Sequence, residues 1–362
     1  MKFNYKFFSY KKIYMHFCIL AFFNIFFSTE NIYAKTLTVN DIEISTPFEI
    51  NFDKNEIIDE GFIKAFDYLI LSIVQTNNQK KLKKIPIKLI KGMIETFSIK
   101  EEKFIDEIYY LTLNVSFNKK KLFNLLESKN VFLSLPIEKK VLFIPIIIDE
   151  NNDEVLIFSE SNLFKKWNLD IKNYHLLKYI LPSDDLEDFT LIKNNSNNLE
   201  NYHFKEIIQK YNLKDYIITI IFKNNKEIRV LNKINFHDKI DIKNLSFKNI
   251  DFSNDIEIKT FIENLKSIFE NYWKSKNQIN TSVKLPLTIS IDNYDYSKIS
   301  KFELVLNNID LIYDVNIYKF NNKNNIYKII FNGSPDYFLK IMKDKNYEFE
   351  TQNQIWHVKW AI

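Results

Sequence analysis

The sequence is poor in the residues on which several classes of site depend. Its 362 residues include one cysteine, three glycines and a single arginine, Arg229. Gly61, Gly92 and Gly333 lie far apart, so the chain has neither of the phosphate-binding loops GxGxxG and GxxxxGK. Bidentate recognition of bases and phosphates relies on the guanidinium group, and one arginine therefore argues against a nucleic-acid partner.

Histidines are also few and scattered. Those that follow residue 34 are His175, His203, His237 and His357, and none shares a short segment with another. The paired-ligand spacings of zinc sites, such as HExxH, are therefore absent, and no serine stands in a GxSxG motif. We predict that the protein uses no metal and no cofactor.

Residues 1–34 have the pattern of a secretory signal peptide. Lysines at the start precede an apolar stretch, 13–27, and Ala34 is a small residue suited to signal peptidase. As a helix this stretch spans about 22 Å, less than the ~30 Å hydrocarbon core of a bilayer. We predict cleavage after Ala34 and a periplasmic protein without a thiol, because Cys18 leaves with the signal. The alternative is an uncleaved segment that anchors the protein in the inner membrane as its sole membrane contact.

The remaining composition is that of a folded globular chain. Hydrophobic residues make up 46%, aromatic residues 16% and charged residues 27%, which argues against extensive disorder. The length allows two or three compact units. Periodicity predicts an amino-terminal unit over 35–135, a second unit over 136–250, a bridging helix over 251–284 and a last unit over 285–362.

Three patterns locate secondary structure most clearly. Residues 109–117 alternate between apolar and polar side chains, as in a strand with one buried face. The run VLFIPIII at 141–148 is typical of a strand buried on both faces. Apolar residues three and four positions apart between Ile258 and Trp273 predict a long amphipathic helix. A shorter helix is predicted to start at Pro86 and to include Phe97.

The fold class follows from the order of these elements. We predict an α+β protein with three small sheet-and-helix units, the middle one mixed α/β. The last 78 residues read as strand, helix, two strands, helix and one or two closing strands. That βαββαβ order is the order of the ferredoxin-like unit.

A cluster of acidic side chains follows Pro182: Asp184, Asp185, Glu187 and Asp188. Paired carboxylates can perform acid–base chemistry, as in glycosidases. Acidic residues in the first turn of a helix also satisfy its free N–H groups and its dipole, and we favour this capping interpretation. If the cluster is a binding site, these four residues would form it.

A group of lysines forms the second candidate surface. Lys80, Lys81, Lys83 and Lys84 crowd a loop, with Lys88 close behind. Such a patch can bind anionic lipid headgroups. We favour the simpler interpretation, a solvated loop in a lysine-rich chain.

Several segments, taken in order, are similar to one family. They are the strand–helix segment TLNVSFNKKKLFNLL, the strand VLFIPIII, the acidic segment LPSDDLEDFTLI and the helix–strand segment KEIIQKYNLKDYIITIIF. Over about residues 37–275 the chain resembles the proteobacterial "domain of unknown function 2066" family, especially its alphaproteobacterial members. The resemblance implies an envelope protein of undetermined activity, with no catalytic residues to carry over.

These observations favour a non-enzymatic binding or assembly module of the cell envelope, with an envelope protein as its partner. The alternative is a hydrolase that acts on envelope carbohydrate or peptide through the acidic residues 184–188. A third possibility is a protein that binds lipid surfaces through Lys80, Lys81, Lys83 and Lys84.

Overall fold

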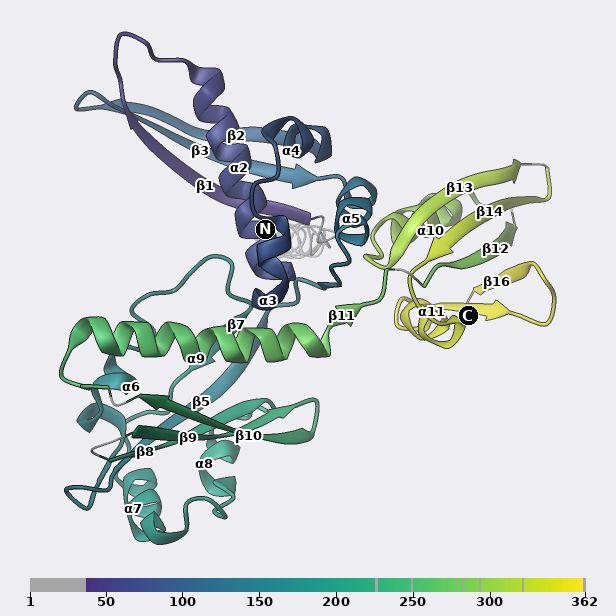
Figure 1. The fold of residues 1–362 in the computed structure, drawn as a ribbon. Coiled ribbons are helices and arrows are strands. Elements are labelled where there is room, and N and C mark those ends of the chain that lie inside the picture. The colour runs from purple at the N-terminus through teal and green to yellow at the C-terminus, as the bar shows by residue number, and fades with distance from the viewer. Residues whose placement is uncertain are drawn as a thin grey trace, which may run out of the picture.

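The computed structural model describes residues 37–224, 227–248, 250–281, 283–292, 294–320 and 322–360. It confirms the α+β class, with helices packed on several small sheets (Figure 1). The signal peptide predicted over 1–34 lies outside the described residues. Among the described residues, no helix has both the length and the apolar character that a membrane crossing requires.

The amino-terminal unit is a three-stranded antiparallel sheet with helices on one face (Figure 1). In sheet order, its strands are β1 (Leu37–Pro47), β3 (Ile108–Phe117) and β2 (Ile94–Ile105). Its helices are α2 (Lys54–Ile73), α3 (Thr76–Gln79), the 3-10 turn η1 (Lys80–Leu82), α4 (Ile87–Met93) and α5 (Lys119–Ser128). A Cβ atom at Gly61 of α2 would lie 2.5 Å from Leu113 and 2.7 Å from Ile44, so glycine allows α2 to lie close to the sheet.

The helix predicted from Pro86 to Phe97 is shorter than expected. It ends at Met93 as α4, and Phe97 belongs to β2. The reason is tertiary, because residues 94–105 pair with β3 and this ladder satisfies their backbone groups.

The middle unit has a mixed sheet. Its strands run in the order β10-β9-β8-β5-β6, with β7 also paired to β5. They are β5 (Lys139–Asp149), β6 (Glu154–Leu156), β7 (Leu177–Ile180), β8 (Tyr216–Lys223), β9 (Glu227–Phe236) and β10 (Lys239–Lys248). β5 is parallel to β7 and β8 and antiparallel to β6.

Strand β5 is buried on both faces, as its continuous apolar run predicts. Val141 and Phe143 join the hydrophobic cluster on one face, whereas Leu142, Ile144 and Ile146 join the cluster on the other. Short helices surround this sheet: η2 (Phe158–Glu160), α6 (Asn162–Lys166), α7 (Leu186–Asn194), η3 (Ser196–Asn198) and α8 (Lys205–Lys210).

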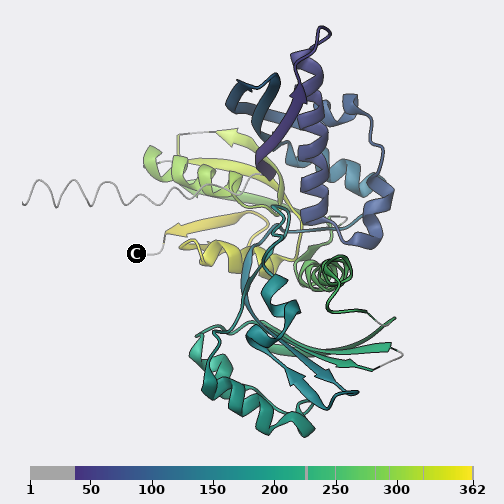
Figure 2. The ribbon, with the colours of Figure 1, turned by 90° about the vertical axis from the view of Figure 1, so that its left-hand side faces the viewer.

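Helix α9 (Asp255–Lys276) lies between the middle sheet and the amino-terminal unit (Figures 1 and 2). Phe261, Leu265, Phe269 and Trp273 contribute to the same core as Val141 and Phe143, so the long helix is part of the middle unit's core. The chain then enters β11 (Gln278–Ile279), which pairs with β4 (Leu133–Ser134).

The last unit has a sheet in the order β13-β14-β12-β16-β15. Its elements are β12 (Leu285–Asp292), α10 (Tyr296–Asn307), β13 (Ile312–Phe320), β14 (Asn324–Phe331), α11 (Pro335–Lys343), β15 (Tyr347–Glu350) and β16 (Trp356–Trp360). β12, β13 and β14 pair as in a ferredoxin-like unit. The last edge departs from it, because the chain turns back after β15 and places β16 parallel to β12, where that fold has an antiparallel strand.

The first and last units share one hydrophobic cluster. Polar contacts also join these two units. Lys119 Nζ donates to the carbonyl oxygen of Ile309 at 2.8 Å, and the Tyr313 hydroxyl donates to Asn124 Oδ1 at 2.7 Å. Burial lowers the pKa of Lys119 to about 8.

Candidate functional site

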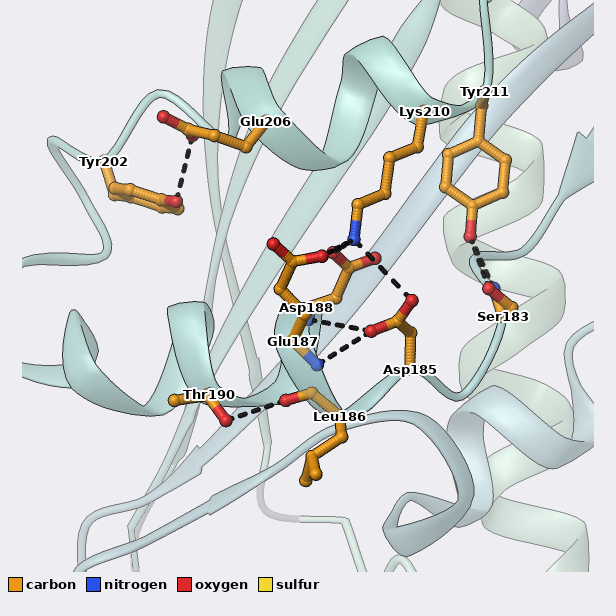
Figure 3. A network of polar contacts seen from close by, with 10 residues as sticks. All are labelled: Ser183, Asp185, Leu186, Glu187, Asp188, Thr190, Tyr202, Glu206, Lys210 and Tyr211. Atoms are coloured by element: carbon orange, nitrogen blue, oxygen red, sulfur yellow. Dashed lines mark hydrogen bonds and ion pairs between the residues drawn. The ribbon is translucent and has the colours of Figure 1, made fainter.

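The acidic cluster lies at the start of α7 and caps it (Figure 3). Asp185 is the N-cap residue, and its Oδ1 accepts hydrogen bonds from the backbone N–H groups of Glu187 at 2.7 Å and Asp188 at 3.4 Å. The bond from Glu187 is the main reason that the pKa of Asp185 lies below its usual value. This geometry supports the capping interpretation.

Lys210, from the end of α8, occupies the centre of the cluster (Figure 3). Its Nζ lies 2.5 Å from Asp188 Oδ1, 2.9 Å from Glu187 Oε2 and 3.6 Å from Asp185 Oδ2. The hydrogen bond with Asp188 is the largest cause of the raised pKa of Lys210. Oxygen atoms of these carboxylates come within 4.8 Å of one another, as metal ligands would, but the ammonium group already supplies the cation. The cluster therefore joins α7 to α8.

Asp184 is also engaged, and none of the four described histidines contacts the acidic cluster. Asp184 accepts a hydrogen bond from Ser159. His203 is exposed just before α8. His175 lies beside α9, on the opposite face of the middle sheet from the core that includes Ile192 of α7. Within the described residues, the four acids therefore interact with Lys210 and Ser159.

The lysine group lies on η1 and in the loop before α4. Lys80, Lys81, Lys83 and Lys84 are all exposed. Lys81 Nζ donates to the carbonyl oxygen of Asn130 at 3.1 Å. Binding of these side chains to lipid remains a prediction.

A cavity that the sequence did not indicate lies along α9. Its volume is about 770 Å³, and its walls come from α9, the end of α2 with α3, and the segment 166–175. Five lysines and four carboxylates line it together with His175 and several apolar side chains. Clefts between structural units are common positions for binding sites.

Three charged residues on α9 face this cavity four positions apart: Lys266, Glu270 and Lys274. They are 3%, 4% and 4% exposed, respectively, which is unusual for charged side chains. Glu270 accepts hydrogen bonds from the backbone N–H groups of Leu176 at 3.1 Å and Leu177 at 2.8 Å. Burial raises the pKa of Glu270. Its carboxyl group thereby fixes the start of β7 against α9.

Lys274 connects α9 to the amino-terminal unit. Its Nζ donates to the carbonyl oxygens of Leu71 and Val74 at the carboxyl end of α2. No basic residue of α2 lies in its own last turn, so Lys274 supplies the positive charge that this end of a helix favours. Burial lowers the pKa of Lys274 to about 8.

Lys266 lies at the centre of the cavity wall. Its Nζ donates to the backbone oxygen of Asp170 at 3.2 Å and lies 5.5 Å from the centre of the Trp167 ring. The Asp170 carboxylate contacts two further ammonium groups, those of Lys172 at 2.7 Å and Lys259 at 3.3 Å. Three lysines therefore converge on one acidic residue.

His175 completes the wall as a neutral imidazole. Burial lowers its pKa to about 4, with further contributions from the charges of Lys266, Lys274, Lys178 and Lys172. Among the described residues, no carboxylate forms a hydrogen bond with its ring. The groups around the ring are instead ammonium groups, which disfavour a further positive charge on it.

His175 gives the fold a defined response to acid. Its folded pKa of about 4 lies below its ordinary value of 6.5. Between these values the unfolded chain binds more protons, so this group reduces stability as the pH falls from 6.5 towards 4. Over that interval we expect the wild type to lose up to about 2 kcal/mol more stability than His175→Asn. This value allows for the partial solvent exposure of the imidazole.

Urea denaturation at pH 7 and pH 4.5 measures this difference. His203→Asn, which removes an exposed histidine, is the matched control and should follow the wild type. Parallel pH profiles for His175→Asn and the wild type would show that the imidazole binds protons equally in the folded and unfolded chain.

Comparison with known proteins gives no relative from which a function could be transferred. No model of a known protein family matches the sequence, and no curated protein matches it. The resemblance to the "domain of unknown function 2066" family stays a prediction.

Proposed function

We propose that the protein is an exported, periplasmic binding or assembly module of the cell envelope, and that the cavity along α9 is its binding site. The observation that carries this proposal is the position of the cavity between α9 and the amino-terminal unit. The charged groups around it are held by backbone atoms or by one another. Charged groups held in this way can orient a ligand.

Exposed sheet edges support a protein partner. β2 and β13 are the outer strands of their sheets. The side chains of β2 are almost all exposed, and so are those of Ile317, Tyr318 and Phe320 at the end of β13. An edge strand with free backbone groups can pair with a strand of another protein.

Export and partnership are testable in one bacterial host. We expect the mature protein to start at Lys35, as seen by intact mass, and to appear in the periplasmic fraction. Photo-crosslinkers at Ser98 on β2 and at Thr76 beside the cavity should capture envelope proteins. Retention in the cytoplasm, or the same capture from a crosslinker at Lys205, which is exposed on α8 away from the sheet edges, would contradict the proposal.

The acidic residues give a separate test against the hydrolase alternative. We expect the double variant Asp185→Asn/Asp188→Asn to complement a deletion strain as well as the wild type. Its melting temperature should fall by a few degrees, because Lys210 loses two of its three ion pairs and α7 loses a charged cap. Loss of function with an unchanged melting temperature would instead favour the hydrolase.

A further inference from the structure

The geometry points to an anionic amphiphile as the ligand of the cavity along α9: a molecule with a carboxylate or phosphate head and an aliphatic body. This inference rests on the proposed binding function and names the class of ligand. Its support comes from three features of the cavity wall, namely the arrangement of cations, the apolar surface and the shape.

The cations around Asp170 outnumber its single carboxylate. Lys172 Nζ lies 2.7 Å from Oδ1, Lys259 Nζ lies 3.3 Å from Oδ2, and Lys266 Nζ lies 3.2 Å from the backbone oxygen. Glu263 is a nearby acid that interacts electrostatically with Lys172 and Lys266. Three positive charges therefore face two negative charges, and an oxyanion would balance them.

Lys266 is the central donor. An ammonium group has three N–H donors, and within the described part of the chain one hydrogen bond, to the oxygen of Asp170, is seen. The group is buried over the rings of Trp167 and Tyr179, where charges interact more strongly than in water. A charge-assisted hydrogen bond to an oxyanion would offset the cost of burying this lysine.

The apolar half of the site surrounds these cations. Leu71, Ile262 and Leu169 line the cavity. Leu169 is 76% exposed and Ile171, two residues further on, is 62% exposed. These side chains leave aliphatic surface beside the cavity that an aliphatic ligand could cover.

The shape of the cavity favours an elongated ligand. Its lining on α9 runs from Asp255 to Lys274, which corresponds to about 28 Å of helix. A volume of about 770 Å³ is within the range of small-molecule sites. A compact ion would leave most of this length empty, whereas an alkyl chain could follow it.

Calorimetry with the purified protein and four dodecyl compounds tests the inference. The probes are dodecanoate, dodecyl phosphate, dodecyltrimethylammonium and dodecyl maltoside, each below its micelle concentration, with inorganic phosphate as a fifth probe. We expect one or both anionic dodecyl compounds to bind at least tenfold more tightly than the cationic and neutral ones. If dodecanoate binds more tightly than dodecyl phosphate, the head of the ligand is a carboxylate. If dodecyl phosphate binds more tightly, the head is a phosphate.

Matched variants locate the binding. Lys266→Met should weaken binding of the anionic compound roughly 10- to 100-fold, because a hydrogen bond to a charged group is lost. Lys165→Met, which removes an exposed lysine of α6, should leave binding unchanged. Lys259→Met, at the more exposed rim, should weaken binding several-fold and replaces Lys266→Met if the latter fails to fold.

The other results separate failure of this inference from failure of the proposed function. Equal binding of cationic, neutral and anionic chains would overturn the ligand class and leave the cavity as a binding site. If inorganic phosphate bound as tightly as dodecyl phosphate, the alkyl chain would contribute nothing to binding, and the inference of an aliphatic body would be wrong. Binding of no probe would overturn the inference, while the crosslinking result at Thr76 would decide the proposed function independently.

Discussion

Replacing Glu270 with alanine is expected to destabilise the protein by about 3–5 kcal/mol, which is a large part of the stability of a typical domain. The carboxyl group is buried and accepts hydrogen bonds from the N–H groups of Leu176 and Leu177. Without it, both donors at the start of β7 lose their partner. The buried ammonium group of Lys274 would also lose the carboxylate that interacts with it electrostatically.

Two variants on the same helix make this result specific. Glu263→Ala removes an exposed carboxylate two turns earlier and should change the free energy of unfolding by less than about 0.5 kcal/mol. Glu270→Gln keeps a carbonyl acceptor of similar size and should lose about half as much stability as Glu270→Ala.

Urea denaturation gives the free energies, and hydrogen exchange gives the local effect. We expect the amides of Leu176 and Leu177 to exchange faster in Glu270→Ala than in Glu263→Ala. If Glu270→Ala unfolded at the same urea concentration as Glu263→Ala, the buried carboxyl group would not hold β7 to α9.

The elements that the sequence predicted best are those whose pattern depends on one periodic environment. β3 alternates because one face lies under α2 and the other does not, and its buried residues are the expected ones. β5 is apolar throughout because helices cover both faces. The apolar stripe of α9 meets the middle sheet as its spacing predicts. In these elements the local pattern and the tertiary environment agree.

Elements at the edges of sheets were harder to predict. β2 has exposed side chains along nearly its whole length, so its sequence has no alternation to mark it as a strand. The helix expected to reach Phe97 therefore extended into it. At the other end of the chain, the sequence predicted either one or two closing strands. The parallel pairing of β16 with β12 depends on where the chain turns after Glu350. The local sequence of β2 and that of the closing strands do not contain this information about strand pairing.

The candidate site shows the same division. Asp185 caps α7, with Glu187 and Asp188 in the first turn of the helix, and the acidic sequence indicates this because capping is a local interaction. Lys266, Glu270 and Lys274 have the four-residue spacing that is common among charges on the solvated face of a helix, so their sequence does not mark them as buried. Their burial depends on Asp170, on Leu176 and Leu177, and on the end of α2, all of which lie about 90 to 200 residues away. Sequence spacing cannot reveal contacts of that range.

Replacing Trp273 with alanine tests the other face of α9. The side chain is 1% exposed, lies 5.0 Å from the ring of Phe236, and donates its indole N–H to the carbonyl oxygen of Ile137 at 2.7 Å. We expect a loss of about 3–5 kcal/mol, because a large cavity forms in the core that joins α9 to the middle sheet. Trp273→Phe keeps most of the ring and loses the hydrogen bond, and should lose about 1–2 kcal/mol.

Ile256→Ala is the matched control, because this side chain is exposed on the first turn of the same helix and should be nearly neutral. Thermal and urea denaturation measure the loss of stability in each variant. We expect the loss to be largest for Trp273→Ala, smaller for Trp273→Phe and smallest for Ile256→Ala. A loss below about 1 kcal/mol for Trp273→Ala would mean that α9 is not fixed to the middle sheet. The cavity on its opposite face would then have no rigid wall, and buried charges such as Lys266 could not be held in place to bind a ligand.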